Sequence, residues 1–411
     1  MKLLGFIFIL FFGVSPTHAM AVPVVNGVSW QLADHRKKTI ANINYKIELN
    51  IPSLPKVPIK ATSEITFDLN DVSEDLQIDF KENNQNINAI RVNGIRQTIV
   101  HYNEHIIIAK RFLNHGENTI KITYLAGEDA LNRSGNFLYT LFVPDRMRTS
   151  FPSFDQPNLK ATFELALNLP ESWETMSSAP VARVSSRDLR KRVRFRKSDK
   201  MSTYLFSFVA GRFNKEVRKI DGLEMTMLHR EPDADQVKRN VDEIFKLHKA
   251  SIDYMEDYTG IKFPFQKFGF VLIPSFQFGG MEHVGAIFYK DASIILDENP
   301  SETDQLSRAA LIGHETAHMW FGDLVTMDWF NDVWTKEVFA NFMSAKLVNP
   351  SFPKIDHALR SHLRFHPGAY SVDRTEGPNP IRQNLPNLNE AGSMYGAIIY
   401  NKAPIMMKQL E

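Results

Sequence analysis

The spacing of hydrophobic residues divides the chain into two parts. Between about residues 24 and 213, apolar and polar residues mostly alternate, as in strands that bury one face. The alternation is clearest in the segments 45–49, 105–108, 119–124 and 161–167. Pairs such as Asn93-Gly94 mark the turns between them. We predict an antiparallel β-sandwich of one or two twisted, saddle-like sheets for this part.

A helical spacing replaces the alternation after Gly211. Residues 233–258 carry apolar side chains three to four positions apart, which predicts one long amphipathic helix. Two short apolar runs, 268–273 and 286–289, predict buried strands, and helix-favouring residues dominate from 301 onward. The expected fold class is therefore α+β, with a mainly helical second part.

The length of 411 residues allows about two or three domains. We place a β domain at 20–217 and the mainly helical domain at 218–411. Before them, Lys2 and an apolar run at 3–14 lead to small residues that suit cleavage after Ala19 or Ala21. The run is shorter than the roughly 20 residues of a spanning helix. We expect a signal peptide at 1–19 and an exported protein, periplasmic or secreted, without a stable membrane span; an uncleaved anchor is the alternative.

Charge and cysteine content narrow the chemistry. Lys plus Arg (48) nearly equals Asp plus Glu (47), which argues against nucleic acid as a partner. The basic run 190–197 has arginines at every second position, so we expect the solvated face of an edge strand there. The chain has no cysteine, so any metal must be held by His, Asp and Glu. The oligomeric state is not specified by the sequence.

Five residues carry a metal-binding pattern, His314-Glu315-Thr316-Ala317-His318. Histidines four apart on a helix lie one turn above each other, so both imidazoles can reach one ion. Glu315 projects beside the pair, where it can act as a general base without being a ligand. A pattern this short also occurs in unrelated proteins, where the histidines pack against other residues or face solvent.

A third ligand would separate these alternatives. Glu337 lies in a second helix-like run, 334–342, and the interval from His318 is long enough for a turn and an antiparallel return helix. Two histidines and one carboxylate leave a fourth position open, as in catalytic zinc sites. A lone helical glutamate more often faces solvent, but the motif upstream favours Glu337 as a ligand. We therefore expect one Zn²⁺.

Several separated blocks extend this pattern: 151–157, 160–163, 201–205, 279–283, 311–327 and 329–334 followed by Glu337. Together they resemble the zinc aminopeptidase N family of the gluzincin metallopeptidases, over nearly the whole mature chain. The resemblance implies a β domain followed by a thermolysin-like zinc domain. It implies a zinc-dependent aminopeptidase acting on peptides with a free N-terminus. Because the chain stops at Glu411, it also implies that the catalytic domain is incomplete.

The same resemblance implies roles for residues around the metal. In Gly279-Gly280-Met281-Glu282, the carboxylate of Glu282 would bind the α-ammonium of the substrate. Tyr400 would stabilise the oxyanion formed during hydrolysis, with Tyr395 as the second choice.

The sequence departs from the family pattern at several of these positions. His283 and Gly280 stand where Asn and Ala are usual, and Lys336 and Val338 replace Asn and Gly. We expect Gly280 to be harmless, and a lysine at 336 to be tolerable if its ammonium points to solvent. Two other functions stay open: a zinc endopeptidase, and a truncated, inactive peptide-binding module.

Overall fold

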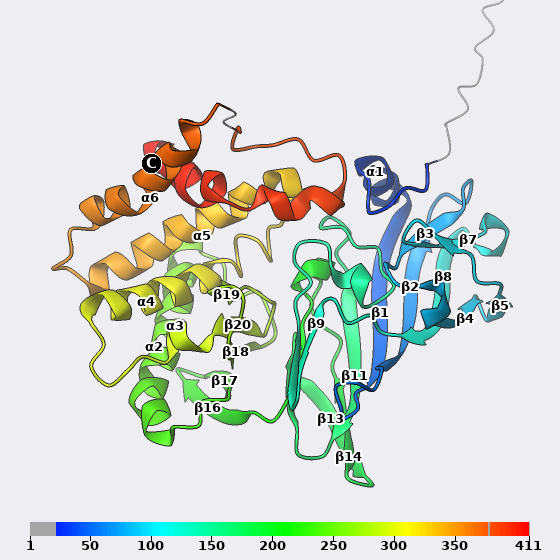
Figure 1. Cartoon of the computed structure of the whole chain (residues 1–411), viewed down its shortest axis with the longest axis horizontal. Coiled ribbons are helices and arrows are strands. Elements are labelled where there is room, and N and C mark those ends of the chain that lie inside the picture. The colour runs from blue at the N-terminus through cyan, green and yellow to red at the C-terminus, as the bar shows by residue number, and fades with distance from the viewer. Residues whose placement is uncertain (1–21, 377–378, 411) are drawn as a thin grey trace, which may run out of the picture.

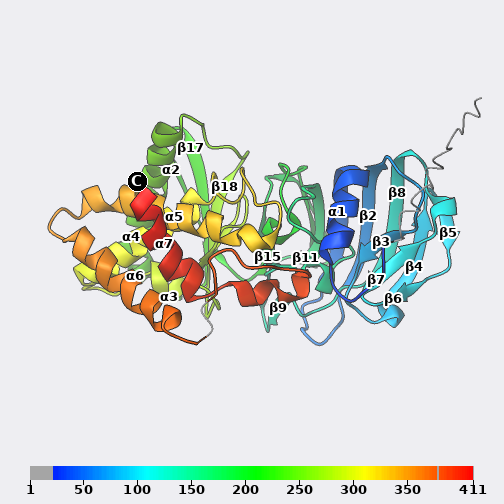
Figure 2. The same ribbon diagram turned by 90° about the horizontal axis from the view of Figure 1, so that it is seen from above.

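A computed structural model describes residues 22–376 and 379–410, so the predicted signal peptide lies outside the described residues. Figures 1 and 2 show a β-rich half formed by the N-terminal part and a half dominated by helices α2 to α7. This arrangement confirms the α+β fold class. Among the described residues, no helix combines the length and the apolar character needed to cross a bilayer.

A mixed eight-stranded sheet forms the centre of the β-rich half, in the order β13-β14-β11-β1-β2-β8-β4-β5. Helix α1 (Trp30–Thr39) precedes it. The strands are β1 (Ile40–Asn50), β2 (Lys60–Leu69), β4 (Ile87–Val92), β5 (Ile95–Gln97), β8 (Gly116–Leu125), β11 (Thr162–Pro170), β13 (Val181–Arg187) and β14 (Arg190–Phe195). In β2 and β11, buried residues alternate with partly exposed ones, as the sequence pattern predicts.

Two smaller sheets complete this half, with the orders β12-β15-β10-β9 and β3-β7-β6. Their strands are β3 (Leu76–Asp79), β6 (His101–Tyr102), β7 (His105–Ile108), β9 (Leu131–Ser134), β10 (Phe137–Thr140), β12 (Glu174–Ser177) and β15 (Phe208–Gly211). A continuous apolar core joins the sheets, and aromatic pairs such as Phe163 on Phe206, 4.3 Å between ring centroids, lie within it.

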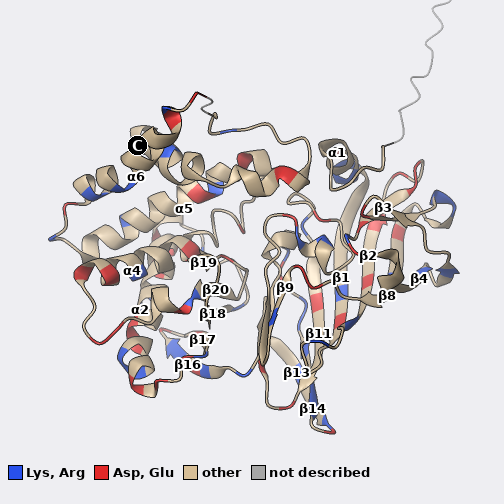
Figure 3. Ribbon diagram, viewed as in Figure 1, with Lys and Arg blue, Asp and Glu red and all other residues tan. Residues whose placement is uncertain are grey.

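The large sheet differs from the expectation in two details. Strands β1 and β11 run parallel, whereas the other pairs are antiparallel. Strand β14 is not an edge strand, because β13 pairs with its outer side. Every residue of β13 is exposed, so β13 lacks the alternation of buried and exposed positions that predicts a strand. The prediction that β14 forms the edge was therefore wrong. The solvated face itself is confirmed: Arg192 and Arg194 are exposed while Val193 is buried, and the β14 ribbon carries the blue of basic residues in Figure 3.

The second half is built on a five-stranded sheet with the order β16-β17-β18-β20-β19. Its strands are β16 (Asn214–Ile220), β17 (Leu223–His229), β18 (Phe268–Ile273), β19 (Gly280–Met281) and β20 (Ile287–Lys290). The helices are α2 (Ala234–Thr259), α3 (Asp291–Ile294), α4 (Glu302–Ala317), α5 (Val333–Val348), α6 (His357–Asp373) and α7 (Ala403–Leu410). The predicted helix at 233–258 corresponds to α2, whose N-cap is Asp233.

The break between the two sets of sheets falls at residues 212–213, after β15. The predicted boundary at 217/218 lies inside β16, which pairs along its whole length with β17. The domain limits 20–217 and 218–411 stay a prediction, and the sheet pairing favours a limit a few residues earlier.

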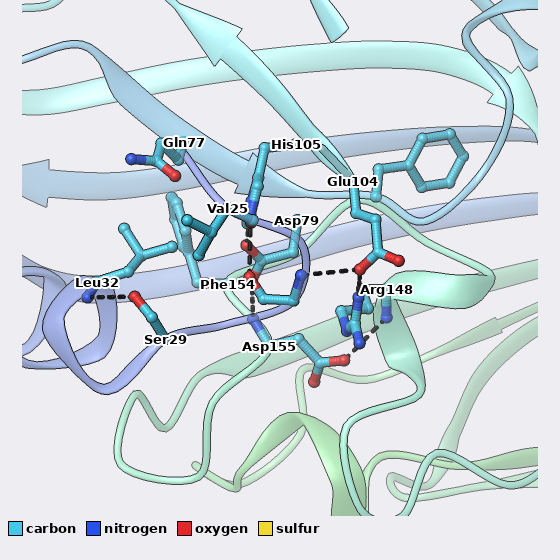
Figure 4. A network of polar contacts seen from close by, with 12 residues as sticks. Val25, Ser29, Leu32, Gln77, Asp79, Glu104, His105, Arg148, Phe154 and Asp155 are labelled. Carbon is cyan, nitrogen blue, oxygen red and sulfur yellow. Dashed lines mark hydrogen bonds and ion pairs between the residues drawn. The ribbon is translucent and has the colours of Figure 1, made fainter. Parts of the chain in front are cut away.

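A buried ion cluster ties α1 to the β-rich half (Figure 4). Asp79, fully buried, accepts hydrogen bonds from Arg36 at 2.8 Å and from the backbone N–H of Asp155 at 2.8 Å. The imidazole of His105 lies 2.9 Å from the same carboxylate. Burial alone would raise the pKa of Asp79, but Arg36 and His105 hold it well below the ordinary value.

We expect Asp79→Asn to lower the free energy of unfolding by about 3–5 kcal/mol at pH 7, because Arg36 would lose its buried partner. The contribution of a carboxyl with a lowered pKa is present above about pH 4, its unfolded value, and is lost as the pH falls further. Urea unfolding at pH 7 and pH 3 measures both. Asp34→Asn, which removes an exposed pair with Lys38, is the control and should change stability by less than about 1 kcal/mol.

Candidate metal and peptide site

Helix α4 presents the two histidines. Ser301 caps its first turn in a reciprocal arrangement with Asp304, and the helix runs on to His318. His314 and His318 lie one turn apart, and their Nε2 atoms are 3.1 Å from each other. Both rings therefore point toward one place, as the spacing predicts.

Helix α5 brings the third donor. It packs antiparallel to α4, since Ser344 bonds to the carbonyl of Ala310 near one end while Glu337 meets both histidines near the other. Glu337 Oε2 lies 3.5 Å from His314 Nε2 and 3.6 Å from His318 Nε2. The return helix expected from the 19-residue interval is thus present.

These three donor atoms fit a zinc ion. Bonds of about 2.0–2.1 Å to a tetrahedral zinc separate neighbouring donors by about 3.3–3.4 Å. The separations of 3.1, 3.5 and 3.6 Å bracket this value. Two imidazoles and one carboxylate are also the ligand chemistry of zinc. The residues present could hold one Zn²⁺ without a large change of the two helices.

The outer contacts of the ligands support this geometry. His318 Nδ1 donates to the backbone carbonyl of Phe321 at 3.0 Å, which leaves its Nε2 lone pair free for a metal. His314 is the more accessible imidazole, with its side chain 16% exposed against 1% for His318. The candidate metal position therefore faces the cleft on the His314 side.

The cleft has a volume of about 1540 Å³ and lies between α4, α5, α6 and the segment before β20. Its lining includes His314, Glu315, Glu337 and the predicted substrate segment Gly279, Gly280, Met281 and Glu282. All the predicted site residues thus reach one cavity, and their individual roles stay predictions.

Glu315 is buried beside the histidines and is aimed at Gly280. A Cβ atom added to Gly280 would lie 2.3 Å from Glu315 Oε1, so the missing side chain makes room for this carboxylate. Burial raises the pKa of Glu315 to about 8, and the nearby carboxylates act in the same direction. The expectation that glycine at 280 is merely harmless was incomplete, because Glu315 occupies the space it leaves.

We expect Gly280→Ala to displace the Glu315 carboxylate and lower kcat about tenfold or more, since small misplacements of a reacting group are costly. Steady-state hydrolysis of an aminoacyl amide measures the change. Gly392→Ala is the matched control, because Gly392 also lines the cleft but a Cβ there meets nothing within 4 Å. Equal kcat values for Gly280→Ala and the parent chain would contradict this coupling.

Glu282 follows the edge strand β19 and is buried in an ion pair with Lys336. The Lys336 ammonium also lies 3.2 Å from Glu337 Oε1 and 5.2 Å from the ring centroid of Tyr204. The ammonium does not point to solvent, the condition under which the sequence would make a lysine here tolerable, since Lys336 is 4% exposed. Two carboxylates and an aromatic face supply the partners that make burial of the charge tolerable.

The charges of this cluster stabilise one another. Burial would raise the pKa of Glu282, but the Lys336 ammonium lowers it below the ordinary value. Burial would likewise depress the pKa of Lys336, but Glu282 and Glu337 keep it well above the ordinary value. Lys336 and Glu282 are therefore both charged near neutral pH.

His283, in place of the usual Asn, is a packing residue. Its ring lies 4.5 Å from that of Phe288, and neither ring nitrogen has a hydrogen-bond partner among the described residues. Burial lowers its pKa to about 3, so the ring is neutral at ordinary pH. The substitution adds no charge next to Glu282.

Two tyrosines face the cleft from the segment before α7. Tyr400 lies in a π-helical turn, Ile398–Lys402, a feature frequent at functional sites, and is 36% exposed. The hydroxyl of Tyr395 is buried and has no hydrogen-bond partner within the described ranges. The rings lie 6.4 Å apart. Burial raises the pKa of both phenols, which stay protonated and able to donate.

We expect Tyr400→Phe to lower kcat about 10²-fold, the effect of losing one oxyanion donor, with little change in KM. Tyr395→Phe is the matched comparison, and its expected loss is smaller. The reverse order in kcat would transfer the role to Tyr395, whose unpaired hydroxyl makes it the alternative donor.

Sequence reasoning missed two features of the site. The ion pair between Lys336 and Glu282 joins residues 54 positions apart, and no local pattern signals it. The carbonyl of Phe321, which orients His318, carries no side-chain signature at all. The departures at positions 280 and 336 from the family pattern were the available clues.

Two protein-family models match this chain. Residues 244–411 match the Peptidase family M1 domain, and residues 41–205 match the Peptidase M1 N-terminal domain. Tricorn protease-interacting factor F2 of Thermoplasma volcanium is 32% identical over 280 residues, covering 68% of this chain and 35% of that protein.

Other relatives are named as aminopeptidases. The puromycin-sensitive aminopeptidase of Caenorhabditis elegans is 33% identical, with 66% of this chain and 29% of that protein covered. The glutamyl aminopeptidase of Bitis rhinoceros is 32% identical, with 72% and 30% covered. The match thus spans about a third of the length of these curated relatives. Since the two M1 domain models together match most of the chain, the chain belongs to peptidase family M1, the zinc aminopeptidase family.

Proposed function

We propose that this protein is a zinc-dependent aminopeptidase that removes the first residue of peptides with a free N-terminus. The observation that carries the proposal is the triangle of donor atoms from His314, His318 and Glu337 at one wall of a large cleft. Membership of family M1 and relatives named as aminopeptidases support it.

When bound, one Zn²⁺ would polarise the scissile carbonyl and activate water. Glu315, buried beside the histidines, would take the proton of the attacking water and return it to the leaving amine. Burial raises its pKa above the ordinary value, which makes the ionised carboxylate a stronger base than an exposed one. Tyr400, which lines the same cleft, would donate to the developing oxyanion.

Glu282 would orient the substrate by accepting from its α-ammonium. A fixed carboxylate near the metal position confines cleavage to the first peptide bond, because an internal residue has no charged amine to offer. We further propose export of the mature protein to the periplasm or the medium, on the basis of the N-terminal sequence alone. Cell fractionation with an antibody to the mature chain tests the location.

The function is tested with a pair of substrates, a free aminoacyl amide and its N-acetylated form. We expect the zinc-loaded protein to hydrolyse the free amide and to leave the acetylated one intact. Equal rates on both would refute the aminopeptidase assignment and favour an endopeptidase. Zinc removal by a chelator should abolish turnover, and added Zn²⁺ should restore it.

A further inference from the structure

The position of Lys336 bears on how the site recognises an amine. Its ammonium pairs with Glu282 Oε1 and lies 3.2 Å from Glu337 Oε1, while Glu337 Oε2 faces the two imidazoles. The lysine therefore leaves the metal-facing oxygen of Glu337 free. It engages the carboxylate that an incoming α-ammonium would need.

The environment keeps the ammonium in place. Lys336 and both carboxylates are each about 96% buried, and the ring of Tyr204 lies beside the charge. An α-ammonium entering here meets a like charge at short range, and like charges in a buried site repel strongly.

We propose that Lys336 is a specificity-determining residue that occupies the amine-binding carboxylate of this protein as a tethered cation. A substrate with a free N-terminus must displace Lys336 from Glu282 or share the carboxylate with it. The proposal rests on the aminopeptidase function proposed above and adds a built-in competitor to it. It expects weaker discrimination between free and blocked N-termini than an unoccupied Glu282 would give.

The test measures binding rather than turnover. Leucinol carries a free amine but no scissile bond, and N-acetyl-leucinol lacks the charged amine. Calorimetry on zinc-loaded Lys336→Asn should show leucinol binding about tenfold tighter than to the parent chain, with N-acetyl-leucinol unchanged. Lys336→Arg, which keeps a cation, should show no gain. Lys249→Gln is the matched control, because it removes a largely covered lysine of α2 that also pairs with two carboxylates, those of Asp221 and Asp253.

Two results would overturn the proposal. One is leucinol binding to Lys336→Asn that is no tighter than to the parent chain. The other is an equal gain for both ligands, which indicates a merely wider cleft. Lys336→Gln provides a second neutral variant. If both neutral variants unfold while Lys336→Arg folds, Lys336 is a structural cation and the proposal also fails.

The experiments distinguish a failure of the proposed function from a failure of the proposal for Lys336. A selective gain in leucinol binding without hydrolysis of any free aminoacyl amide would leave Lys336 as the competitor and remove the aminopeptidase assignment. Hydrolysis confined to free N-termini, with no tighter leucinol binding in the Lys336→Asn variant, would keep the aminopeptidase assignment and remove the proposal for Lys336.

Discussion

Glu315→Gln is expected to lower kcat about 10²–10⁴-fold while the protein keeps its zinc, because an amide cannot take the proton of the attacking water. Glutamine has nearly the same shape, and Glu315 is not among the three donor atoms around the proposed metal position. The variant should fold at least as well as the parent chain, since a buried carboxyl whose pKa is raised by desolvation is replaced by a neutral group.

Steady-state kinetics on a free aminoacyl amide, with the zinc content measured on the same sample, separates chemistry from metal loss. Glu302→Gln is the control, an exposed glutamate in the first turn of the same helix α4. A kcat within twofold of the parent value for Glu315→Gln would exclude Glu315 as the general base.

Glu337→Ala is expected to abolish activity by a different route, loss of the metal. Removal of a direct ligand should weaken zinc binding by more than the roughly 10–100-fold typical of groups that only orient a ligand. The variant also takes one of two carboxylates from the buried Lys336, so some loss of stability should accompany it.

Competition with a fluorescent zinc chelator measures the affinity of this variant. Asn341→Ala is the matched control, because Asn341 lies one turn further along α5 and also lines the cleft. It should bind zinc like the parent chain. Unchanged zinc affinity in Glu337→Ala would show that the carboxylate is not a ligand.

The metal-binding helices could be predicted because their signals are local. The four-residue spacing places both histidines on one face of α4, and the interval to Glu337 is long enough for a turn and a return helix. Burial of Lys336 could not be predicted in this way. An isolated lysine on a helix is ordinarily solvated. The partner of Lys336, Glu282, follows strand β19, far away in the sequence.

The same contrast between local and long-range signals applies to the sheets. Alternation identifies strands such as β2 and β11, but it does not specify which strand pairs with which. The parallel pairing of β1 with β11 depends on more than 100 intervening residues, and the exposed strand β13 has no alternation to announce it. Long-range pairing is a property of the whole core and is absent from any local window.

The central claim is that one zinc ion is held between α4 and α5. Anomalous diffraction at the zinc absorption edge, from crystals grown with one equivalent of Zn²⁺, tests it most directly. We expect a single strong peak within about 2.0–2.1 Å of His314 Nε2, His318 Nε2 and Glu337 Oε2. A peak at any other place in the molecule, or no peak in catalytically active crystals, would contradict it.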